Sequence, residues 1–317
     1  HLHIYIMNIL FTEMEYHNLQ WQVKLVEDGH TVYTTQTGSP NYLKTLNINS
    51  ISDIEYRVFT NPDNYTELNN NLPLTHLDKL EQVIEKYKID LIINTWPTFN
   101  SIIHKKDFGI DIISANETSI KLETEKQFGK MFAEKCGMKA PKTLQTGEDH
   151  RKLNTESLPN QFILKPSEFW NSSTVIQDKK ILEHSSIGVL LGIPLAMKYF
   201  CEEHIKGYET NISYIMSEGK WSFTFSEHCD ESNAKLAIVG EGPHAWYVNT
   251  TVEQLTPEVD KMVRDNVVDY LDSAAKLGGT YEGSITQMLG KDGELYFLEN
   301  NCRPYVQNTF PLPLGGN

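Results

Sequence analysis

The first third of the chain alternates short apolar runs with segments whose apolar residues recur every three or four positions. The apolar runs cover residues 3–11, 31–35, 56–59, 90–94 and 111–114. Residues 15–27 and 77–87 show the helical spacing. Alternating strands and helices predict an open α/β sheet. Because ligands of such sheets bind at the carboxyl ends of the strands, we expect a site near the loops after Phe11 and Asn94.

The middle of the chain combines one long helical pattern with strand-rich stretches. The helix is predicted to begin at Asn116, a favourable N-terminal cap, and to end at Gly137. Strands are expected at residues 161–165, 174–177 and 195–203, followed by a β-rich stretch as far as Phe225. This order predicts a smaller region inserted between the helix and a larger sheet.

The C-terminal part contains a second long helix and a hairpin. Thr256 and Pro257 are typical of a helix start, and the apolar positions continue to Leu277, where two glycines follow. Residues 281–289 and 294–300 are predicted strands on either side of a short turn that contains Asp292 and Gly293.

Composition places the chain among globular proteins. Its 317 residues are 39% hydrophobic and 22% charged, enough for about two domains with cores of their own. The net charge of −14 argues against a nucleic-acid surface, which needs clustered Lys and Arg, but leaves room for a small anion held by a few cations. The four cysteines are far apart and form no CxxC pair, so we expect reduced thiols. Without a membrane-length apolar run or a basic leader, the sequence predicts a cytoplasmic protein with no membrane contact.

The end of the predicted hairpin carries the most informative polar residues. Glu299 and Asn301 are two positions apart on a strand, so they point to the same face. A carboxylate and an amide oxygen on one face suit Mg²⁺. Arg303 falls on the same side if the strand continues, where it could hold a phosphate. Taken alone, such a segment is more often an edge strand with solvated polar ends.

Two other apolar strands also end in charged residues. Residues 199–203 end in Glu202 and Glu203, and Glu209 follows after a glycine, so backbone groups could meet an adenine edge and a carboxylate could meet ribose hydroxyls. Lys165 closes the run at residues 162–164, where it could extend to water or meet a phosphate. Each feature alone is more often ordinary surface charge.

Together, in this order and spacing, the three segments resemble the ATP-grasp superfamily, and within it the phosphoribosylamine–glycine ligases (glycinamide ribonucleotide synthetases). Leu298-Glu299-Asn300-Asn301-Cys302-Arg303 is similar to the Leu-Glu-Phe-Asn-Cys-Arg of that family, and residues 123–130 look like its acid-Gly-Ser-Lys-x-Phe-x-Lys segment. Residues 15–21 resemble a further family segment near the N-terminus.

The resemblance implies a role for each matching residue. The positions that match ATP ligands are Lys126, Lys165, Glu202, Glu203, Ile205 and Glu209, and those that match magnesium ligands are Glu299 and Asn301. Arg303 and Lys165 are the candidate catalytic residues, and Mn²⁺ could replace Mg²⁺. His17 and His244 are weaker candidates for substrate contact, because a packed or solvated histidine is commoner.

The resemblance also implies an architecture. An open parallel-sheet (pre-ATP-grasp) α/β domain at residues 1–115 would precede an ATP-grasp α+β unit at residues 116–317, with a small lid subdomain at about residues 140–204. The family's further C-terminal domain is expected to be missing after Asn317.

Several positions depart from the family. Thr12, Glu13 and Met14 stand where the family has glycines in its ribosylamine site, and residues 166–173, which match the phosphate-covering loop, contain no glycine. Residues 241–246 keep only the Gly-Pro of the acceptor loop. Thr286 and Gln287, the positions expected to face Glu299, are not acids, which leaves Glu282 as the only nearby candidate for a second metal.

Three functions follow from this pattern. The first is an ATP- and Mg²⁺-dependent ligase that joins a carboxylate to an amine through an acyl phosphate, with a substrate pair different from that of the family. The second is a nucleotide-binding protein without catalysis. The third is an authentic phosphoribosylamine–glycine ligase of purine biosynthesis. Each would act on small molecules as a monomer or homodimer.

Overall fold

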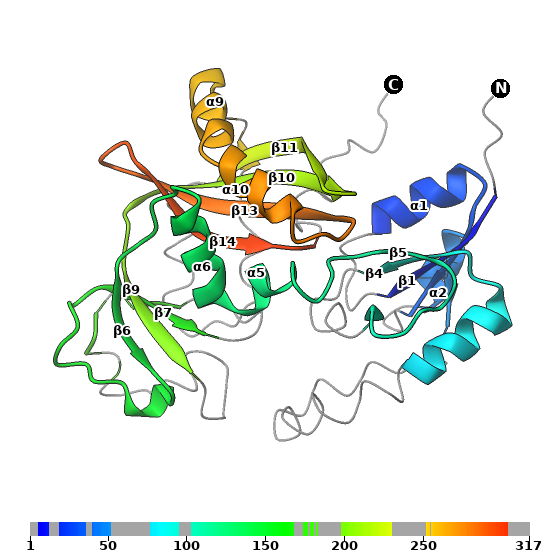
Figure 1. Ribbon diagram of the computed structural model, residues 1–317, viewed down its shortest axis with the longest axis horizontal. Helices are drawn as coiled ribbons and strands as arrows, with labels where there is room; N and C mark the ends of the chain where they lie inside the picture. Colours follow the sequence, from blue (N-terminus) through cyan, green and yellow to red (C-terminus); the bar gives the residue numbers. More distant parts are fainter. Residues whose placement is uncertain are drawn as a thin grey trace.

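The described residues of the computed structural model form three β-sheets with helices packed on two of them (Figure 1). The structure describes residues 6–12, 19–35, 40–51, 77–94, 103–167, 174–176, 178–180, 182, 198–229, 252–253 and 255–303. Among the described helices, none is long and apolar enough to cross a membrane.

The N-terminal sheet is parallel, with the strand order β3-β2-β1-β4-β5. Its strands are β1 (Asn8–Thr12), β2 (Thr31–Thr34), β3 (Asn49–Ser50), β4 (Leu91–Asn94) and β5 (Asp111–Ile113). The associated helices are α1 (Leu19–Glu27), α2 (Pro40–Thr45) and the helical residues 77–87. Separate apolar clusters pack around Leu10 and around its neighbours Ile9 and Phe11, so both faces of β1 are buried, which explains its continuous apolar run.

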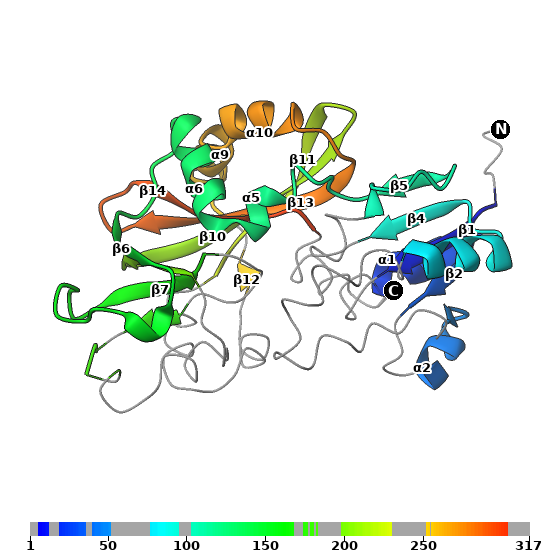
Figure 2. The same ribbon diagram turned by 60° about the horizontal axis from the view of Figure 1, so that its bottom comes forward.

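The largest sheet is antiparallel, with the order β12-β11-β10-β13-β14. Its strands are β10 (Gly207–Ser217), β11 (Lys220–Cys229), β12 (Val252–Glu253), β13 (Tyr281–Gly290) and β14 (Leu295–Asn301). The helices α5 (Lys121–Thr124), α6 (Lys126–Lys135), α9 (Pro257–Asp265) and α10 (Val268–Ala275) contribute to its core, and Figure 2 shows α6, α9 and α10 along one face.

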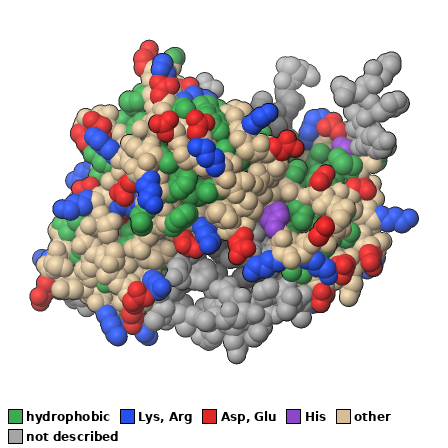
Figure 3. Space-filling view, in the orientation of Figure 1, with side chains coloured by type: hydrophobic (Ala, Val, Ile, Leu, Met, Phe, Trp, Pro, Cys, Tyr) green, Lys and Arg blue, Asp and Glu red, His purple; other side chains and the backbone are tan. Residues whose placement is uncertain are grey.

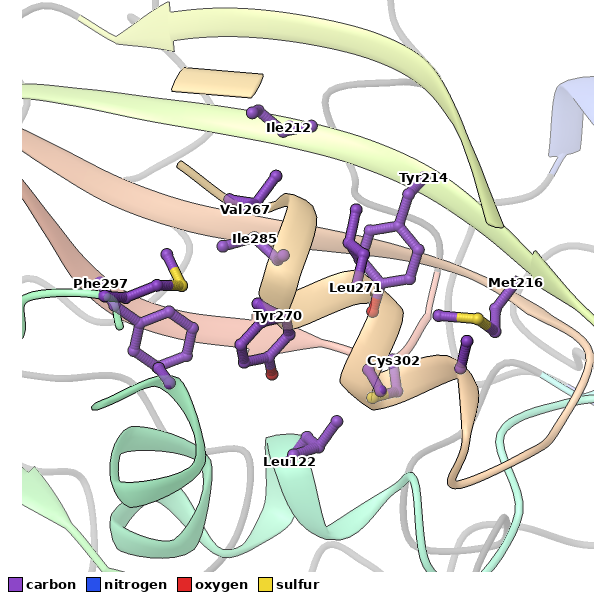
Figure 4. Packing of buried hydrophobic residues seen from close by; sticks show 14 of the residues in the cluster. Leu122, Ile212, Tyr214, Met216, Val267, Tyr270, Leu271, Ile285, Phe297 and Cys302 are labelled. Carbon is purple, nitrogen blue, oxygen red and sulfur yellow. The ribbon is translucent and has the colours of Figure 1, made fainter. Parts of the chain in front are cut away.

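The core between this sheet and its helices is rich in aromatic residues (Figure 4). Tyr270 of α10 packs edge-on to Phe132 of α6, with ring centroids 5.2 Å apart, and lies 5.6 Å from the ring of Phe297 on β14. Tyr214 of β10 is also fully buried and donates its hydroxyl to Asn300 Oδ1 at 2.9 Å. Burial of such large side chains is the main stabilising contribution of this layer.

A smaller antiparallel sheet lies across from the other face of the large sheet (Figure 2). Its order is β6-β9-β7-β8, formed by β6 (Thr143–Gly147), β7 (Phe162–Pro166), β8 (Thr174–Ile176) and β9 (Tyr199–Glu203), with the 3₁₀ turn η4 (His150–Lys152) after β6. Residues 204–206 join β9 to β10 and so connect the two antiparallel sheets.

The predicted fold class, an open parallel sheet followed by an α+β part, is confirmed. In the first third, the predicted strands 3–11, 31–35, 90–94 and 111–114 overlap β1, β2, β4 and β5, residues 56–59 lie outside the described part of the chain, and the short β3 was not predicted. The division into domains at residue 115 and the extent of the lid stay predictions.

The two long helices were predicted wrongly as continuous. Asn116 does cap, since its Oδ1 accepts from the backbone of Thr118 and Ser119, but it caps a turn before α5. The chain then leaves helical geometry at Glu125, with φ of −106° and ψ of 79°, before α6 begins. The helix from Thr256 is likewise interrupted between α9 and α10. Val267, which lies in the interruption, is fully buried in the core.

Candidate functional site

A row of polar side chains covers the face of the large sheet that is turned away from its helices. On β10, β13 and the end of β14 the core-facing positions include Tyr214, Ile285 and Asn300, whose Oδ1 accepts from the Tyr214 hydroxyl, so the alternating positions lie on the opposite face. These alternating positions are Glu209, Asn211, Ser213, Glu282, Ser284, Thr286, Glu299 and Asn301. A buried polar face of this kind is costly unless hydrogen bonds or a ligand satisfy it.

The strand register brings these side chains into two rows. Asn211, Thr286 and Glu299 are direct partners across the three strands, and the Thr286 hydroxyl donates to Asn211 Oδ1 at 2.6 Å. Ser213, Ser284 and Asn301 form the next row. Gln287 has the same parity as the core-facing Ile285 and lies on the helix side, where it donates to Val263 O, which corrects the prediction that it faces Glu299. The register shift after Thr286 leaves Leu298 as the extra residue of β14, so Phe297 faces the core while Glu299 faces the polar side.

Two lysines from other elements reach this face. Lys126, the first residue of α6, has its Nζ 3.5 Å from Glu299 Oε2. Lys165 of β7 donates to the backbone oxygen of Leu298 at 3.3 Å. Both side chains are at most 8% exposed. The break before α6 matters here, because the backbone amide of Lys126 donates to Ser167 O at the end of β7, at 3.1 Å. The lysine-bearing elements are therefore tied to each other next to Glu299.

Arg303 reaches the same place by another route than predicted. β14 ends at Asn301, so Arg303 does not continue the strand. Its guanidinium donates to Asn301 Oδ1 at 3.3 Å and, through Nε, to Glu123 Oε1 at 2.8 Å. The other oxygen of Glu123 accepts the backbone amide of Cys302 at 2.8 Å. Glu123, from α5, thus fixes the end of β14 and the arginine together.

The predicted hinge residues lie at the junction of the two antiparallel sheets. Glu202 is 2% exposed and its carboxylate is turned inward between Lys130 and Lys165. Glu203 Oε1 accepts the backbone amide of Lys142 at 2.8 Å. Ile205 lies in the connection that follows and is half-buried. The carboxylates of Glu202 and Glu203 thus have protein partners, so we expect a flat ligand to meet the backbone of this segment and Ile205.

Burial and neighbouring charges shift the pKa values of the two acids at the site, Glu209 and Glu299, in opposite directions. Burial, and then the charge of Glu299, raises the pKa of Glu209 to about 7. Burial also opposes ionisation of Glu299, but Lys126, Lys165 and Arg303 together lower its pKa. For Lys126, burial outweighs the attraction of Glu299 and lowers its pKa. These mutual effects place Glu209, Glu299 and the two lysines in one electrostatic unit.

Comparison with solved structures identifies the fold. The L-amino acid ligase of Bacillus licheniformis is 14% identical over 94% of this chain and 67% of the ligase, with a TM-score of 0.65. Phosphoribosylamine–glycine ligase of Thermotoga maritima is 13% identical over 95% of this chain and 70% of that one, also with a TM-score of 0.65. The chain has the ATP-grasp fold.

A third structure with this ATP-grasp fold carries a nucleotide. It is the biotin carboxylase domain of 2-oxoglutarate carboxylase from Hydrogenobacter thermophilus, in complex with MgADP, ADP and bicarbonate. It is 13% identical over 96% of this chain and 66% of that one, with a TM-score of 0.62. No protein-family model and no curated protein sequence matches the chain. The ATP-grasp likeness therefore concerns the fold.

The magnesium that the ATP-grasp resemblance implies fits the donor set on the polar face. Glu299 supplies a carboxylate, and Asn301 an amide oxygen, on one side of β14. Opposite Asn301, the hydroxyl of Ser284 is fully buried and has no hydrogen-bond partner among the described residues. Oxygen donors with a single carboxylate suit Mg²⁺ that is bound mostly by phosphates. In the described chain, no group of three or more His, Cys, Asp or Glu side chains forms a metal site without such help.

Some predicted residues lie outside the described part of the chain. They are His17, His244, Glu13, Met14 and the loop residues 168–173. Glu282, the candidate for a second metal, is described and lies on the same face as Thr286, four positions along β13 and opposite Ile215 of β10.

Sequence reasoning missed two residues that shape the candidate site on the polar face. Glu123 and Lys130 both fall inside the matched segment at residues 123–130, yet neither received a role. Lys130 lies one helical turn after Lys126, a spacing that places both on one face of α6 and that could have drawn attention to it. Nothing in the sequence indicates that Glu123 would meet Arg303, 180 positions later.

Proposed function

We propose that the protein is an ATP- and Mg²⁺-dependent ligase that joins a small carboxylate to an amine. The observation that carries the proposal is the meeting of Lys126, Lys165 and Glu299, from three separate elements, on the buried polar face of the large sheet. Two buried cations beside a carboxylate on an oxygen-rich face suit a nucleotide's phosphates and their metal.

The proposed reaction has two steps. A carboxylate oxygen of the first substrate attacks the γ-phosphorus of ATP, and ADP leaves. The amine then attacks the carbonyl carbon of the acyl phosphate, inorganic phosphate leaves, and the amine loses a proton. Phosphoryl transfer needs positioning and charge neutralisation more than covalent help from the protein.

The protein's own residues supply the positioning and the charge neutralisation. Lys126 and Lys165 would bind phosphate oxygens, and Arg303, held by Glu123, would offset the charge that develops on the transferred group. Glu209 would hold ribose hydroxyls, and the segment from Glu202 to Ile205 would border the adenine. Mg²⁺ on Glu299 and Asn301, when bound, would neutralise phosphate charge and orient the phosphates in line. The MgADP of the biotin carboxylase structure supports this choice of ligand.

The substrate pair is proposed from the sequence departures. The ligases for L-amino acids and for phosphoribosylamine have the same TM-score, so the fold favours neither. Thr12, which replaces a family glycine, is fully buried and hydrogen-bonded to Asn94 at the carboxyl ends of β1 and β4. A bulkier, satisfied residue there hinders close approach of a phosphate to the backbone, which favours a different pair from that of purine biosynthesis.

Two experiments test the proposal. ATP with Mg²⁺ at millimolar concentration should raise the thermal stability of the protein, and no shift would refute it. Purified protein is then screened for ADP formation against a panel of carboxylates and amines that includes glycine with phosphoribosylamine. ADP that depends on both added substrates excludes the alternative of a non-catalytic nucleotide-binding protein. Cytoplasmic location, and a monomeric or dimeric state, stay predictions.

A further inference from the structure

Three buried charged side chains form a chain beside the proposed phosphate site. Glu202 of β9 lies between two lysines that come from different elements. Lys130 Nζ of α6 donates to Glu202 Oε1 at 2.7 Å, and Lys165 Nζ of β7 lies 2.9 Å from Oε2. The side chains are exposed by 10% or less. Because buried charges persist only where partners compensate them, the three depend on one another.

Lys130 has no hydrogen left for a ligand. Besides Glu202, its ammonium group donates to the backbone oxygen of Pro141 and to Thr143 Oγ1 at 2.8 Å. An ammonium group carries three hydrogens, and all three have protein acceptors. Lys130 therefore acts on the site through Glu202 and does not itself bind substrate.

Sharing one carboxylate between two ammonium groups has an electrostatic consequence. With Lys130 present, the three side chains carry one net positive charge. Without it, Glu202 and Lys165 would form a neutral pair, and the whole carboxylate could turn to Lys165. Because water screens charges weakly at this burial, the difference would be felt by a phosphate next to Lys165.

The helix α6 connects this triad to the other phosphate lysine. Lys126 and Lys130 are one turn apart on it, and Lys126 lies 3.5 Å from Glu299. One helix thus presents a lysine to the polar face and, a turn later, anchors the acid that contacts Lys165.

We propose that Lys130 is a positioning residue that keeps Lys165 available for a nucleotide phosphate by taking one oxygen of Glu202 for itself. This inference rests on the proposed function, since it assumes that the site takes ATP. It assigns Lys130 a role in phosphate affinity that is separate from holding the fold together.

The test compares the affinity for a ligand that carries phosphates, Mg-ATP, with the affinity for one that carries none, adenosine. Mg-ATP is titrated calorimetrically into wild type and Lys130→Met, and adenosine binding is measured by ligand-observed NMR. We expect ATP affinity to fall about tenfold or more in the variant, with adenosine affinity within about twofold of wild type. A general structural defect would weaken both ligands alike.

Three further variants sharpen the result. Lys130→Met combined with Glu202→Gln should regain most of the ATP affinity, because no carboxylate is left to neutralise Lys165. Lys130→Arg, which keeps the charge and the donors, should bind ATP nearly as wild type does. Lys135→Met removes a charge from an exposed position of the same helix and should change little. If Lys130→Met does not fold, Lys130→Gln, which keeps donors for Glu202, replaces it.

Distinct results overturn the two claims. If wild type binds ATP and Lys130→Met binds it equally well, the role of Lys130 is refuted while the proposed function stands. The same holds if Lys130→Met loses affinity for ATP and for adenosine to the same extent. A double variant no better than the single one refutes it too. If wild type binds no ATP, the proposed function fails and this inference fails with it.

Discussion

Glu209 and Glu299 lie on the same face of the large sheet, yet their pKa values are shifted in opposite directions. Burial and the charge of Glu299 raise the pKa of Glu209 to about 7, whereas three cations together lower the pKa of the partly buried Glu299. Two carboxyl groups with separated pKa values can hold different ligands at neutral pH. At the residue scale, this supports a metal on Glu299 and a sugar hydroxyl on Glu209.

The raised pKa of Glu209 predicts a pH-dependent stability. Its carboxyl binds a proton more tightly in the folded than in the unfolded state, so its contribution is complete below its usual pKa of 4.5 and is lost as pH rises through about 7. Glu209→Gln cannot ionise. The variant should therefore gain stability relative to wild type as pH rises through this window, measured by urea unfolding of the ligand-free protein. The exposed Glu156→Gln serves as the control for removal of a carboxyl group. A stability difference between Glu209→Gln and wild type that does not change with pH would contradict the assignment.

Glu123 is predicted to be a structural requirement of the site. Its carboxylate is 4% exposed and accepts from Arg303 Nε and from the amide of Cys302. Glu123→Ala leaves a buried amide and a half-buried guanidinium without this partner, so the free energy of unfolding should fall by about 3 kcal/mol. Chemical denaturation measures it. The nearby exposed Glu125→Ala serves as the control and should cost less than about 0.5 kcal/mol. Equal losses in both variants would show that the contacts of Glu123 contribute nothing.

At the element scale, the break between α5 and α6 sets the position of Lys126. The two helices fold back on each other at Gly129, where a Cβ atom would lie 2.4 Å from the backbone oxygen of Leu122. Only glycine permits this approach. The close packing keeps the start of α6 against β7, where the amide of Lys126 donates to Ser167 O.

Gly129→Ala should therefore destabilise the protein. In an unobstructed helix interior the same change would stabilise by about 1 kcal/mol, whereas the clash with Leu122 should cost about 2 kcal/mol. Thermal or urea unfolding gives the sign directly. Gln127→Ala, on the same helix, should remain within about 0.5 kcal/mol of wild type. A Gly129→Ala variant at least as stable as wild type would mean that α5 and α6 can separate without cost.

Elements with a strong local signal could be predicted from the sequence. Thr256 caps α9 as expected, accepting from the amide of Val259, and the hairpin turn has Gly293 in the left-handed region, with φ of 82°. The breaks at Glu125 and between α9 and α10 could not be predicted. The apolar positions continue at helical spacing on either side of each break, so the periodicity gives no sign of it.

The candidate site, too, could be predicted from the sequence only in part. The types and order of Lys126, Lys165 and Glu299 could be read from segments near them in sequence. Their pairing could not, because it depends on a strand register and on contacts between residues far apart in the chain, such as Lys165 with Leu298. The contacts of the Glu202 carboxylate with Lys130 and Lys165 could not be predicted for the same reason.

At the scale of the whole molecule, the charge balance explains where the cations matter. The protein carries 28 Lys and Arg against 42 Asp and Glu. On the face in Figure 3, basic and acidic side chains of the described residues are interspersed. The side chains of Lys126 and Lys165, by contrast, are 8% or less exposed, and low exposure strengthens their attraction for an anion. The negative net charge is therefore compatible with the proposed nucleotide site at this one internal position.

The most direct test of this account is calorimetric titration of Mg-ATP into wild type and Lys165→Met. Lys165 is 6% exposed and joins the smaller sheet to β14, so it is expected to contact phosphate. We predict saturable binding to wild type and an affinity about tenfold or more lower in Lys165→Met, with Lys135→Met unchanged. Absence of binding to wild type at millimolar ATP, or equal affinity in wild type and Lys165→Met, would contradict a nucleotide site on this face of the sheet.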